Sequence, residues 1–291
     1  DRDEPSAIAL DPSGNVFVTA ASFDTANSYD YVTLKYSPSG TLLREMRYNG
    51  PPNGLDVPTA LTTDTFGNLY VTGYSTQANG FTDYATVKYS SAGTLLWERR
   101  YNGPADAEDW PFALAVDDSG NVYVTGFSHG IGTSADYATL KYSPSGDLVW
   151  EARHNGAGND WDGATGIALD NLSNVYVTGA STGADKSFDY VTIKYSSAGT
   201  PLWVKSYEGP GKDWDGASTL ALDKSNNVYI TGISVGNEGS YDYATLKYST
   251  SGELLSERRF NGTGNDFDVP TALAVDGLGD VEVTGLSEGS G

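Results

Sequence analysis

An aspartate that recurs every 53 residues is the most regular candidate for chemistry in the sequence. Carboxylate oxygens gathered around one point suit Ca²⁺ or Mg²⁺, and neither histidine nor cysteine stands among them to favour zinc. The alternative is that each aspartate caps its own loop by accepting bonds from backbone N–H groups. Both interpretations stay open, and the first implies Ca²⁺ as a cofactor. The six predicted metal ligands are Asp3, Asp56, Asp109, Asp162, Asp215 and Asp268.

Aromatic residues stand beside these aspartates in several copies: Trp110, Trp161, Trp214 and Phe267. Their flat faces could bind sugar rings or the side chains of a partner, and we predict them as ligand-binding residues. They would equally serve to fill gaps between neighbouring repeats.

The motifs of common enzymes are missing from the sequence, and we predict no catalytic residue. The two histidines have no serine–acid context, and no phosphate-binding glycine loop or zinc-ligand spacing occurs. The motif DYxTxKY occurs five times, from Asp30, Asp83, Asp136, Asp189 and Asp242 onward. Five equal copies favour hydrogen bonding between repeats over catalysis. Glycoside hydrolysis needs only two carboxylates, so an enzyme remains an alternative.

Composition narrows the range of partners. The formal net charge of −21 repels nucleic acid and anionic membranes, so neither is expected as a partner. Cysteine is absent from the sequence, and no apolar run approaches the roughly 20 residues that a membrane helix needs. The sequence opens on Asp1-Arg2-Asp3-Glu4 without a secretory leader, although a leader could have been removed.

The elements that must position these residues follow from an internal repeat. The segments NVFVT, NLYVT, NVYVT, NVYVT, NVYIT and DVEVT begin at positions 15, 68, 121, 174, 227 and 280, always 53 residues apart. In one copy, residues 113–116, 121–125, 136–142 and 148–153 are rich in β-branched and aromatic residues. Short turns that contain glycine separate the second pair of segments in every complete copy.

Four antiparallel strands repeated at this interval are typical of the blades of a β-propeller. We predict an all-β fold, a single propeller domain over residues 1–291, with blades at 1–53, 54–106, 107–159, 160–212 and 213–265 and a partial blade at 266–291. A six-bladed propeller whose last blade has two strands is the preferred count. A longer parent chain and a five-bladed ring with an overhanging half blade are the alternatives.

The unit ALAVDDSGNVYVTGFS, followed by DYATLKYSPSG, resembles the bacterial propeller repeat called SBBP, which is related to the NHL repeats. The resemblance covers essentially the whole chain. It implies the propeller architecture and an extracellular or cell-surface location, and it implies no particular activity.

Three functions are compatible with these patterns. The main prediction is a non-catalytic binding or scaffold propeller that recognises a glycan or protein through the face carrying the loops between second and third strands. The first alternative is a hydrolase or lyase that acts on polysaccharide or lactone at an acidic, cation-assisted site at the channel mouth. The second is a structural segment of a larger adhesin or assembly. Neighbouring copies are a further predicted partner, through the open half blade.

Overall fold

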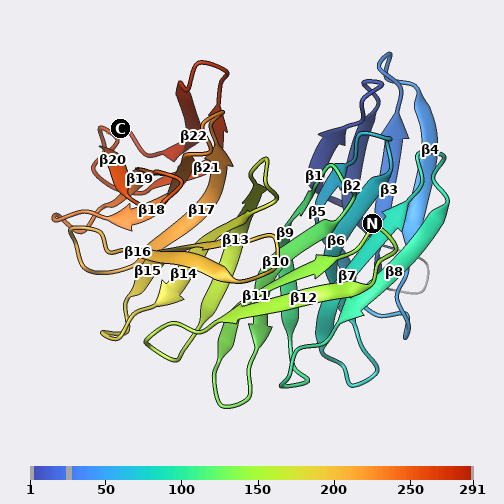
Figure 1. The fold of residues 1–291 in the computed structure, drawn as a ribbon, viewed down its shortest axis with the longest axis horizontal. Coiled ribbons are helices and arrows are strands. Elements are labelled where there is room, and N and C mark those ends of the chain that lie inside the picture. The colour runs from blue at the N-terminus through green and yellow to red at the C-terminus, as the bar shows by residue number, and fades with distance from the viewer. Residues whose placement is uncertain (1–2, 24–27, 290–291) are drawn as a thin grey trace. The chain divides into compact units, whose positions relative to one another are not determined.

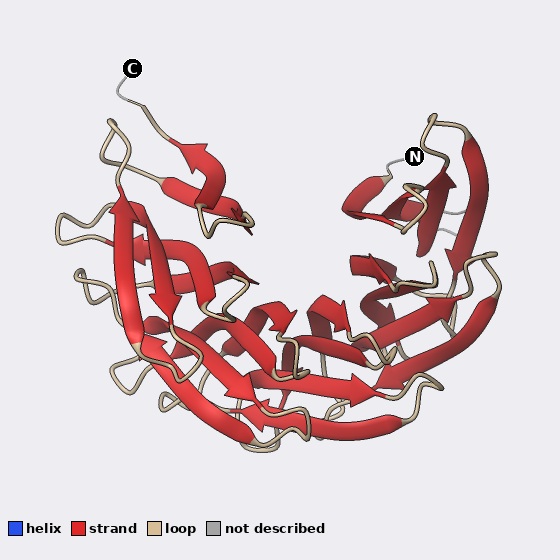
Figure 2. Cartoon of the chain, turned by 45° about the horizontal axis from the view of Figure 1, so that its top comes forward, coloured by secondary structure: helices blue, strands red, loops and turns tan. Residues whose placement is uncertain are grey.

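The repeats form antiparallel sheets in the computed structural model, which describes residues 3–23 and 28–289. Strands and connecting loops account for this part of the chain (Figures 1 and 2). Five sheets have four strands and one has two. The predicted all-β propeller is therefore confirmed, with five complete blades and a sixth that has two strands.

The strands of the first three blades are β1 (Glu4–Leu10), β2 (Val16–Phe23), β3 (Tyr29–Tyr36), β4 (Leu42–Tyr48), β5 (Asp56–Thr63), β6 (Leu69–Thr76), β7 (Thr82–Tyr89), β8 (Leu95–Tyr101), β9 (Asp109–Val116), β10 (Val122–His129), β11 (Ala135–Tyr142) and β12 (Leu148–His154). Those of the last three are β13 (Asp162–Leu169), β14 (Val175–Thr182), β15 (Phe188–Tyr195), β16 (Pro201–Tyr207), β17 (Asp215–Leu222), β18 (Val228–Val235), β19 (Tyr241–Tyr248), β20 (Leu254–Phe260), β21 (Asp268–Val275) and β22 (Val281–Ser287). Each complete blade pairs its strands in chain order.

The first and second strands are longer than the sequence pattern predicted. In the third blade β9 begins at Asp109, whereas the apolar run that we used to predict it begins at residue 113. A β-bulge between Thr125 and Gly126 lets the pairing continue as far as Ser128 opposite Asp109. The bulge interrupts the alternation of side chains, so a pattern with period two ends too early.

Tyrosine and lysine side chains of the third strand join each blade to the next. The tyrosine hydroxyl donates to a backbone carbonyl 54 residues later, as Tyr31 does to Ala85 and Tyr190 does to Ala244, both at 3.2 Å. The lysine ammonium donates to a carbonyl 56 residues later, as Lys88 does to Pro144 at 3.2 Å. The tyrosine and lysine that recur in the DYxTxKY motif therefore make contacts between blades.

The chain forms two compact units, Asp1–Gly132 with Ala138–Glu151, and Thr133–Tyr137 with Ala152–Gly291, and each is described by itself. In both units the core consists of aromatic and β-branched side chains from the second and third strands, such as Val71 and Tyr84 in the first and Ile230 and Leu246 in the second. None of the described residues belongs to a helix long and apolar enough to span a membrane.

Candidate functional site

Five of the six predicted metal ligands are the first residue of their blade's inner strand. Asp56, Asp109, Asp162, Asp215 and Asp268 are fully buried, whereas Asp3 is exposed and precedes β1. Each buried carboxylate accepts a bond of 2.5–2.7 Å from the backbone N–H of the glycine six residues earlier. These bonds hold the loop that leads into the inner strand against the strand itself.

A metal role for these aspartates has little support from the donor geometry. Asp162, for example, accepts bonds from the Gly156 N–H, the Ser181 hydroxyl and the Thr182 N–H at 2.6–2.8 Å. Across residues 3–23 and 28–289, no group of three or more histidine or acidic side chains is arranged to hold a metal ion. The predicted Ca²⁺ site therefore stays a prediction.

Three of the predicted ligand-binding residues belong to one line of rings in the second unit. Trp161, Phe188, Trp214, Tyr241 and Phe267 follow one another with centroid separations of 5.8, 6.4, 6.1 and 5.3 Å, each ring packed edge to face on the next. We call these five residues the aromatic row. The tryptophans are half-buried and Phe267 is 41% exposed, so the row both fills the spaces between blades and reaches solvent.

Trp110 lies in the first unit and has other neighbours. Its ring stacks on Tyr74 at 4.6 Å, and its indole N–H donates to the Thr82 hydroxyl at 2.7 Å. It follows its aspartate, whereas Trp161 precedes Asp162. Asp162, which Trp161 precedes, is followed by Gly163. A Cβ on Gly163 would lie 2.5 Å from the Trp161 ring. The glycine therefore makes room for the indole.

One blade breaks the repeat at a charged position. The arginine near the end of the fourth strand occurs as Arg47, Arg100, Arg153 and Arg259, but the equivalent residue of β16 is Ser206. Arg153 and Arg259 form ion pairs of 3.0 and 2.9 Å with Asp136 and Asp242, the acids at the start of the third strand in their blades. The equivalent acid opposite Ser206 is Asp189, which therefore has no arginine from its own blade.

Asp189 therefore lacks the ion pair that Asp136 and Asp242 form. Burial, together with the negative charges of Asp185, Asp215 and Glu208, raises the pKa of Asp189 to about 6. Its Oδ1 is buried without a hydrogen-bond partner among the described residues. An aspartic acid of this kind holds its proton in mildly acidic solution, where an ordinary aspartate is ionised.

The neighbouring Asp185 is shifted in the opposite direction. It lies on the exposed turn between β14 and β15, where its Oδ1 accepts bonds from the hydroxyl and the N–H of Ser187 at 2.7 and 3.1 Å. These bonds hold the pKa of Asp185 below its usual value. The acid pair, by which we mean Asp185 and Asp189, thus combines a proton donor with a carboxylate.

Gly183 brings the two carboxylates of the acid pair together. A Cβ on this residue would lie 2.9 Å from Asp185 Oδ1 and 3.2 Å from Asp189 Oδ2. The two oxygens are therefore no more than about 6 Å apart. A side chain at position 183 would occupy the space that both oxygens border.

The acid pair adjoins the aromatic row. Thr182, next to the turn, donates its hydroxyl to the Trp161 carbonyl at 2.7 Å, and Phe188 of the row precedes Asp189 in β15. On the same turn, the Lys186 ammonium donates to the Gly158 carbonyl at 2.7 Å. Two loops of one blade therefore bring an acid, a carboxylate and aromatic rings to one site.

The fifth blade holds a version of this arrangement in which the aspartate is paired with arginine. Asp242 and Glu238 occupy the positions of Asp189 and Asp185. Asp242, however, forms the ion pair with Arg259 and accepts a bond of 2.7 Å from the Ser240 hydroxyl. Its charge is neutralised locally, which makes Asp242 the natural control for Asp189.

Asp83 in the first unit is also an acid with a raised pKa, but it is inaccessible. It is fully buried, and neither of its oxygens has a hydrogen-bond partner among the described residues. Burial and the charges of Asp109 and Asp106 raise its pKa to about 7. Arg100 is turned away from it and bonds to Ser75, Thr76 and Tyr48.

Asp83→Asn is expected to stabilise the protein at pH 8. Because the folded pKa of about 7 exceeds the ordinary aspartate pKa of 3.8, the folded state binds the proton more tightly, and stability is lost as the pH rises through this window. Asparagine removes the buried charge, with a gain on the order of 2 kcal/mol at pH 8 and almost none at pH 4. Urea unfolding at both pH values measures the difference. An equal effect at both would contradict a buried, titrating Asp83.

Sequence reasoning missed the acid pair. We set the DYxTxKY motif aside because its copies looked equal, and within the motif they are. The difference lies 17 residues later, where Ser206 replaces arginine, and only knowledge that this arginine pairs with the motif's aspartate gives the substitution a meaning.

The fold and the repeated blades define a β-propeller protein. The family model for the SBBP β-propeller repeat matches residues 46–81 and 99–132. The chain therefore contains SBBP-type β-propeller repeats in these two segments. It is also 23% identical over 293 residues to the uncharacterized WD repeat-containing protein L264 of Acanthamoeba polyphaga mimivirus, a match that covers 80% of this chain and 20% of that protein. The chain therefore spans about a fifth of that relative's length.

Similar solved structures carry the names of enzymes. The periplasmic gluconolactonase PpgL of Pseudomonas aeruginosa aligns with a TM-score of 0.61 and 15% identity, over 97% of this chain and 84% of that one. A glucose dehydrogenase aligns with a TM-score of 0.56 and 10% identity, over 97% and 94%. The propeller domain of the Trilobed protease of Pyrococcus furiosus gives 0.52 and 8%, over 88% and 72%.

The main functional prediction is therefore wrong. We expected a non-catalytic binding or scaffold propeller, but the similarity to a gluconolactonase and a glucose dehydrogenase favours the enzyme alternative. The error has a physical reason. Because the acidic positions recur in every copy, they looked structural. The single departure at Ser206, where other copies have arginine, was therefore overlooked.

Proposed function

We propose that the protein is a hydrolase of sugar-derived substrates, a lactone in the first instance, with the acid pair as its catalytic residues. The observation that carries the proposal is the opposite shift of two neighbouring carboxyl groups, with the pKa of Asp189 raised to about 6 and that of Asp185 lowered. Neighbouring acids whose pKa values are driven apart are typical of general acid–base catalysis.

Lactone hydrolysis uses both members of the pair. The Asp185 carboxylate accepts a proton from water as the water oxygen forms a bond to the lactone carbonyl carbon. Asp189 donates its proton to the ring oxygen as the bond between that oxygen and the carbonyl carbon breaks. The product is the open hydroxy acid, and proton exchange through water restores the pair.

The aromatic row supplies apolar surface next to the acid pair. Trp161 and Trp214 both pack on Phe188, the residue that precedes Asp189. Half-exposed rings beside charged groups suit a sugar ring, which presents apolar C–H faces and polar edges. Trp161, Trp214 and Phe267 are the predicted ligand-binding residues that fit this proposal, whereas Trp110 belongs to the other unit.

The proposal is tested by measuring hydrolysis of a panel of aldonolactones and neutral oligosaccharides from pH 3 to 9. We expect turnover of at least one lactone, with a bell-shaped dependence of kcat on pH. The acid limb reports Asp185 and lies below pH 3.8, and the alkaline limb reports Asp189 near pH 6. Rates equal to buffer across the panel would overturn the assignment.

Ser206→Arg restores the arginine of the other blades and is expected to move the alkaline limb. An arginine here can reach Asp189 as Arg153 reaches Asp136 at 3.0 Å, and its charge favours the ionised carboxylate. We expect the limb to fall by about one pH unit and kcat at pH 6 to fall about fivefold, because the protonated fraction of Asp189 falls by that factor. Ser206→Ala is the matched control and leaves the profile unchanged. If the alkaline limb does not move in Ser206→Arg, Asp189 is not the group whose ionisation produces it.

A further inference from the structure

Two lysines stand next to the acid pair at positions where the other blades have neutral or acidic residues. Lys186 follows Asp185 on the turn between β14 and β15, and Lys212 lies on the loop that leads into β17. The counterparts of Lys186 in the other copies are Asn27, Gly80, Thr133 and Gly239. Those of Lys212 are Asn53, Asp106, Asn159 and Asn265. Only the boundary between the fourth and fifth blades therefore carries a positive charge at these two positions.

Both lysines adopt a backbone conformation that glycine and asparagine hold more easily. The φ angle is +75° at Lys186 and +51° at Lys212, in the left-handed region. Two counterparts of Lys186, Gly80 and Gly239, have φ angles of +90° and +82°. Residues that are held in such conformations against their preference cluster at ligand sites. The turn geometry does not account for the two lysines, whereas a role for their positive charge does.

The Lys186 ammonium is held close to the acid pair by an uncharged acceptor. It donates to the Gly158 carbonyl at 2.7 Å, and the Gly158 N–H donates to the Thr182 carbonyl at 2.8 Å. Gly158 also adjoins Gly183, which borders both carboxylates of the acid pair, because a Cβ on Gly158 would lie 2.5 Å from the Gly183 carbonyl oxygen. An ammonium has three N–H donors, so two of them remain for a ligand.

Lys212 faces the acid pair from the loop of the next blade. In the equivalent place of the fifth blade, Asn265 Nδ2 lies 3.2 Å from Glu238 Oε2. These two residues are the counterparts of Lys212 and Asp185, which therefore face each other in the same way. The hydrogen bonds from Ser187 and the charge of Lys212 both lower the pKa of Asp185. The charge of Lys212 is thus felt at the acid pair.

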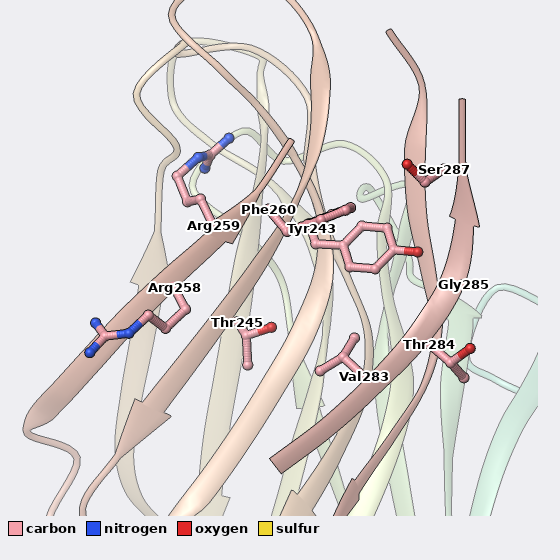
Figure 3. Close-up of a pocket in the computed structure, with 9 residues that line it drawn as sticks. All are labelled: Tyr243, Thr245, Arg258, Arg259, Phe260, Val283, Thr284, Gly285 and Ser287. Carbon is pink, nitrogen blue, oxygen red and sulfur yellow. The ribbon is translucent and has the colours of Figure 1, made fainter. Parts of the chain in front are cut away.

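Neither lysine neutralises an acid by direct contact. Arg259 of β20, which lines the pocket in Figure 3, shows that arrangement in the fifth blade, where it lies 2.9 Å from Asp242. Within residues 3–23 and 28–289, Lys186 and Lys212 form no ion pair. This holds even for Lys212 and Glu208, which lie four residues apart on one loop. Two positive charges therefore remain available beside the acid pair.

We propose that Lys186 and Lys212 bind the carboxylate of an acidic sugar, so that the substrates of this site are sugar derivatives that carry a carboxylate. The inference rests on the proposed function, because it assigns the substrate class of the acid pair. One ammonium from the turn and one from the next blade hold the carboxylate by charge-assisted hydrogen bonds, while the aromatic row contacts the C–H face of the sugar. In a chain with a net charge of −21, an anionic sugar needs such local cations.

Methyl glucuronide and methyl glucoside are the probes, because they differ only in the carboxylate that replaces a hydroxymethyl group. Each is titrated into the full 291-residue chain at pH 5 and low salt, and binding is followed by tryptophan fluorescence. At this pH Asp189 holds its proton, so the site presents less negative charge. We expect the glucuronide to bind about fivefold more tightly than the glucoside, and about 1 M salt to remove the difference.

The variants use residues that the fifth blade already has at these positions. Lys186→Gly and Lys212→Asn introduce the residue types of Gly239 and Asn265, which have the same left-handed backbone. In the double variant we expect the ratio of glucuronide to glucoside affinity to fall about fivefold, with no loss of stability in thermal melts. Lys224→Asn is the matched control. It removes the same charge from an exposed residue at the other end of β17 and leaves the ratio unchanged.

Kinetics with two lactones separate this inference from the proposed function. The five-membered lactones of gluconic and glucaric acid differ in the same way as the two glycosides. We expect the double variant to lower the ratio of kcat/KM for the glucaric to the gluconic lactone about fivefold. Hydrolysis of both lactones with equal binding of the two glycosides overturns the carboxylate site and leaves the acid pair standing. Charge-selective binding without hydrolysis supports the carboxylate site and overturns the acid pair as catalyst. Equal losses of both glycosides in the double variant overturn the carboxylate site.

Discussion

Asp189→Asn is expected to lower kcat for the lactone substrate by about 10²- to 10⁴-fold, the usual contribution of a general acid. The amide has nearly the same shape as the acid but cannot deliver a proton to the leaving oxygen. Because the pKa of Asp189 is raised to about 6, the loss is greatest below pH 6, where the parent acid holds its proton. Steady-state kinetics at pH 5 measures the effect.

Asp242→Asn is the matched control, since Asp242 has the same place in the fifth blade and is paired with Arg259 at 2.9 Å. We expect it to reduce stability by removing one partner of an ion pair while kcat stays within about twofold. Thermal melts of both variants separate unfolding from lost chemistry. Full activity in Asp189→Asn, or equal losses of activity in the two variants, would remove Asp189 from the mechanism.

Asp162→Ala is expected to lower the free energy of unfolding by about 3 kcal/mol. The substitution removes the acceptor for the Gly156 N–H, the Ser181 hydroxyl and the Thr182 N–H. Each buried donor left without a partner costs about 1–3 kcal/mol, and relief of the buried charge offsets part of that sum. Urea unfolding, followed by tryptophan fluorescence, gives the difference.

The same variant decides between the two interpretations of the repeated aspartates. If Asp162 holds the loop, its replacement destabilises the chain equally in calcium and in chelator. If it binds Ca²⁺, the parent protein gains stability in calcium and the variant does not. Asp160, exposed two residues earlier, is the control, and Asp160→Ala is expected to change stability by less than about 0.5 kcal/mol.

The architecture could be predicted from the sequence because each level of the pattern agreed with the next. An exact 53-residue interval, alternating apolar residues and glycine turns all indicated the same four-stranded unit. The boundaries of the inner strands could not, because the bulge that extends β9 back to Asp109 shifts the alternation of its side chains. That extension places the aspartate in the strand instead of the loop.

The candidate site was only half predictable. The sequence predicts Trp161 and Trp214 as aromatic residues in loops. It does not show that both rings pack on Phe188, the first residue of β15. Asp189 looked like four other aspartates because the residue that distinguishes it, Ser206, is remote in sequence and unremarkable in type. The absence of an arginine partner for Asp189 is not part of any sequence motif.

The bonds that the tyrosines and lysines of the DYxTxKY motif make between blades run in one direction along the chain. Tyr31, Tyr84, Tyr137 and Tyr190 each donate to the blade that follows. Lys35, Lys88 and Lys194 do the same. Through these bonds a blade donates to the blade that follows it and accepts from the blade that precedes it, so one copy can follow another. Gene duplication of a whole unit would lengthen the array without redesign, whereas inserting a single residue would carry each hydroxyl away from its carbonyl. The constant interval of 53 residues is what these inter-blade bonds require of the sequence.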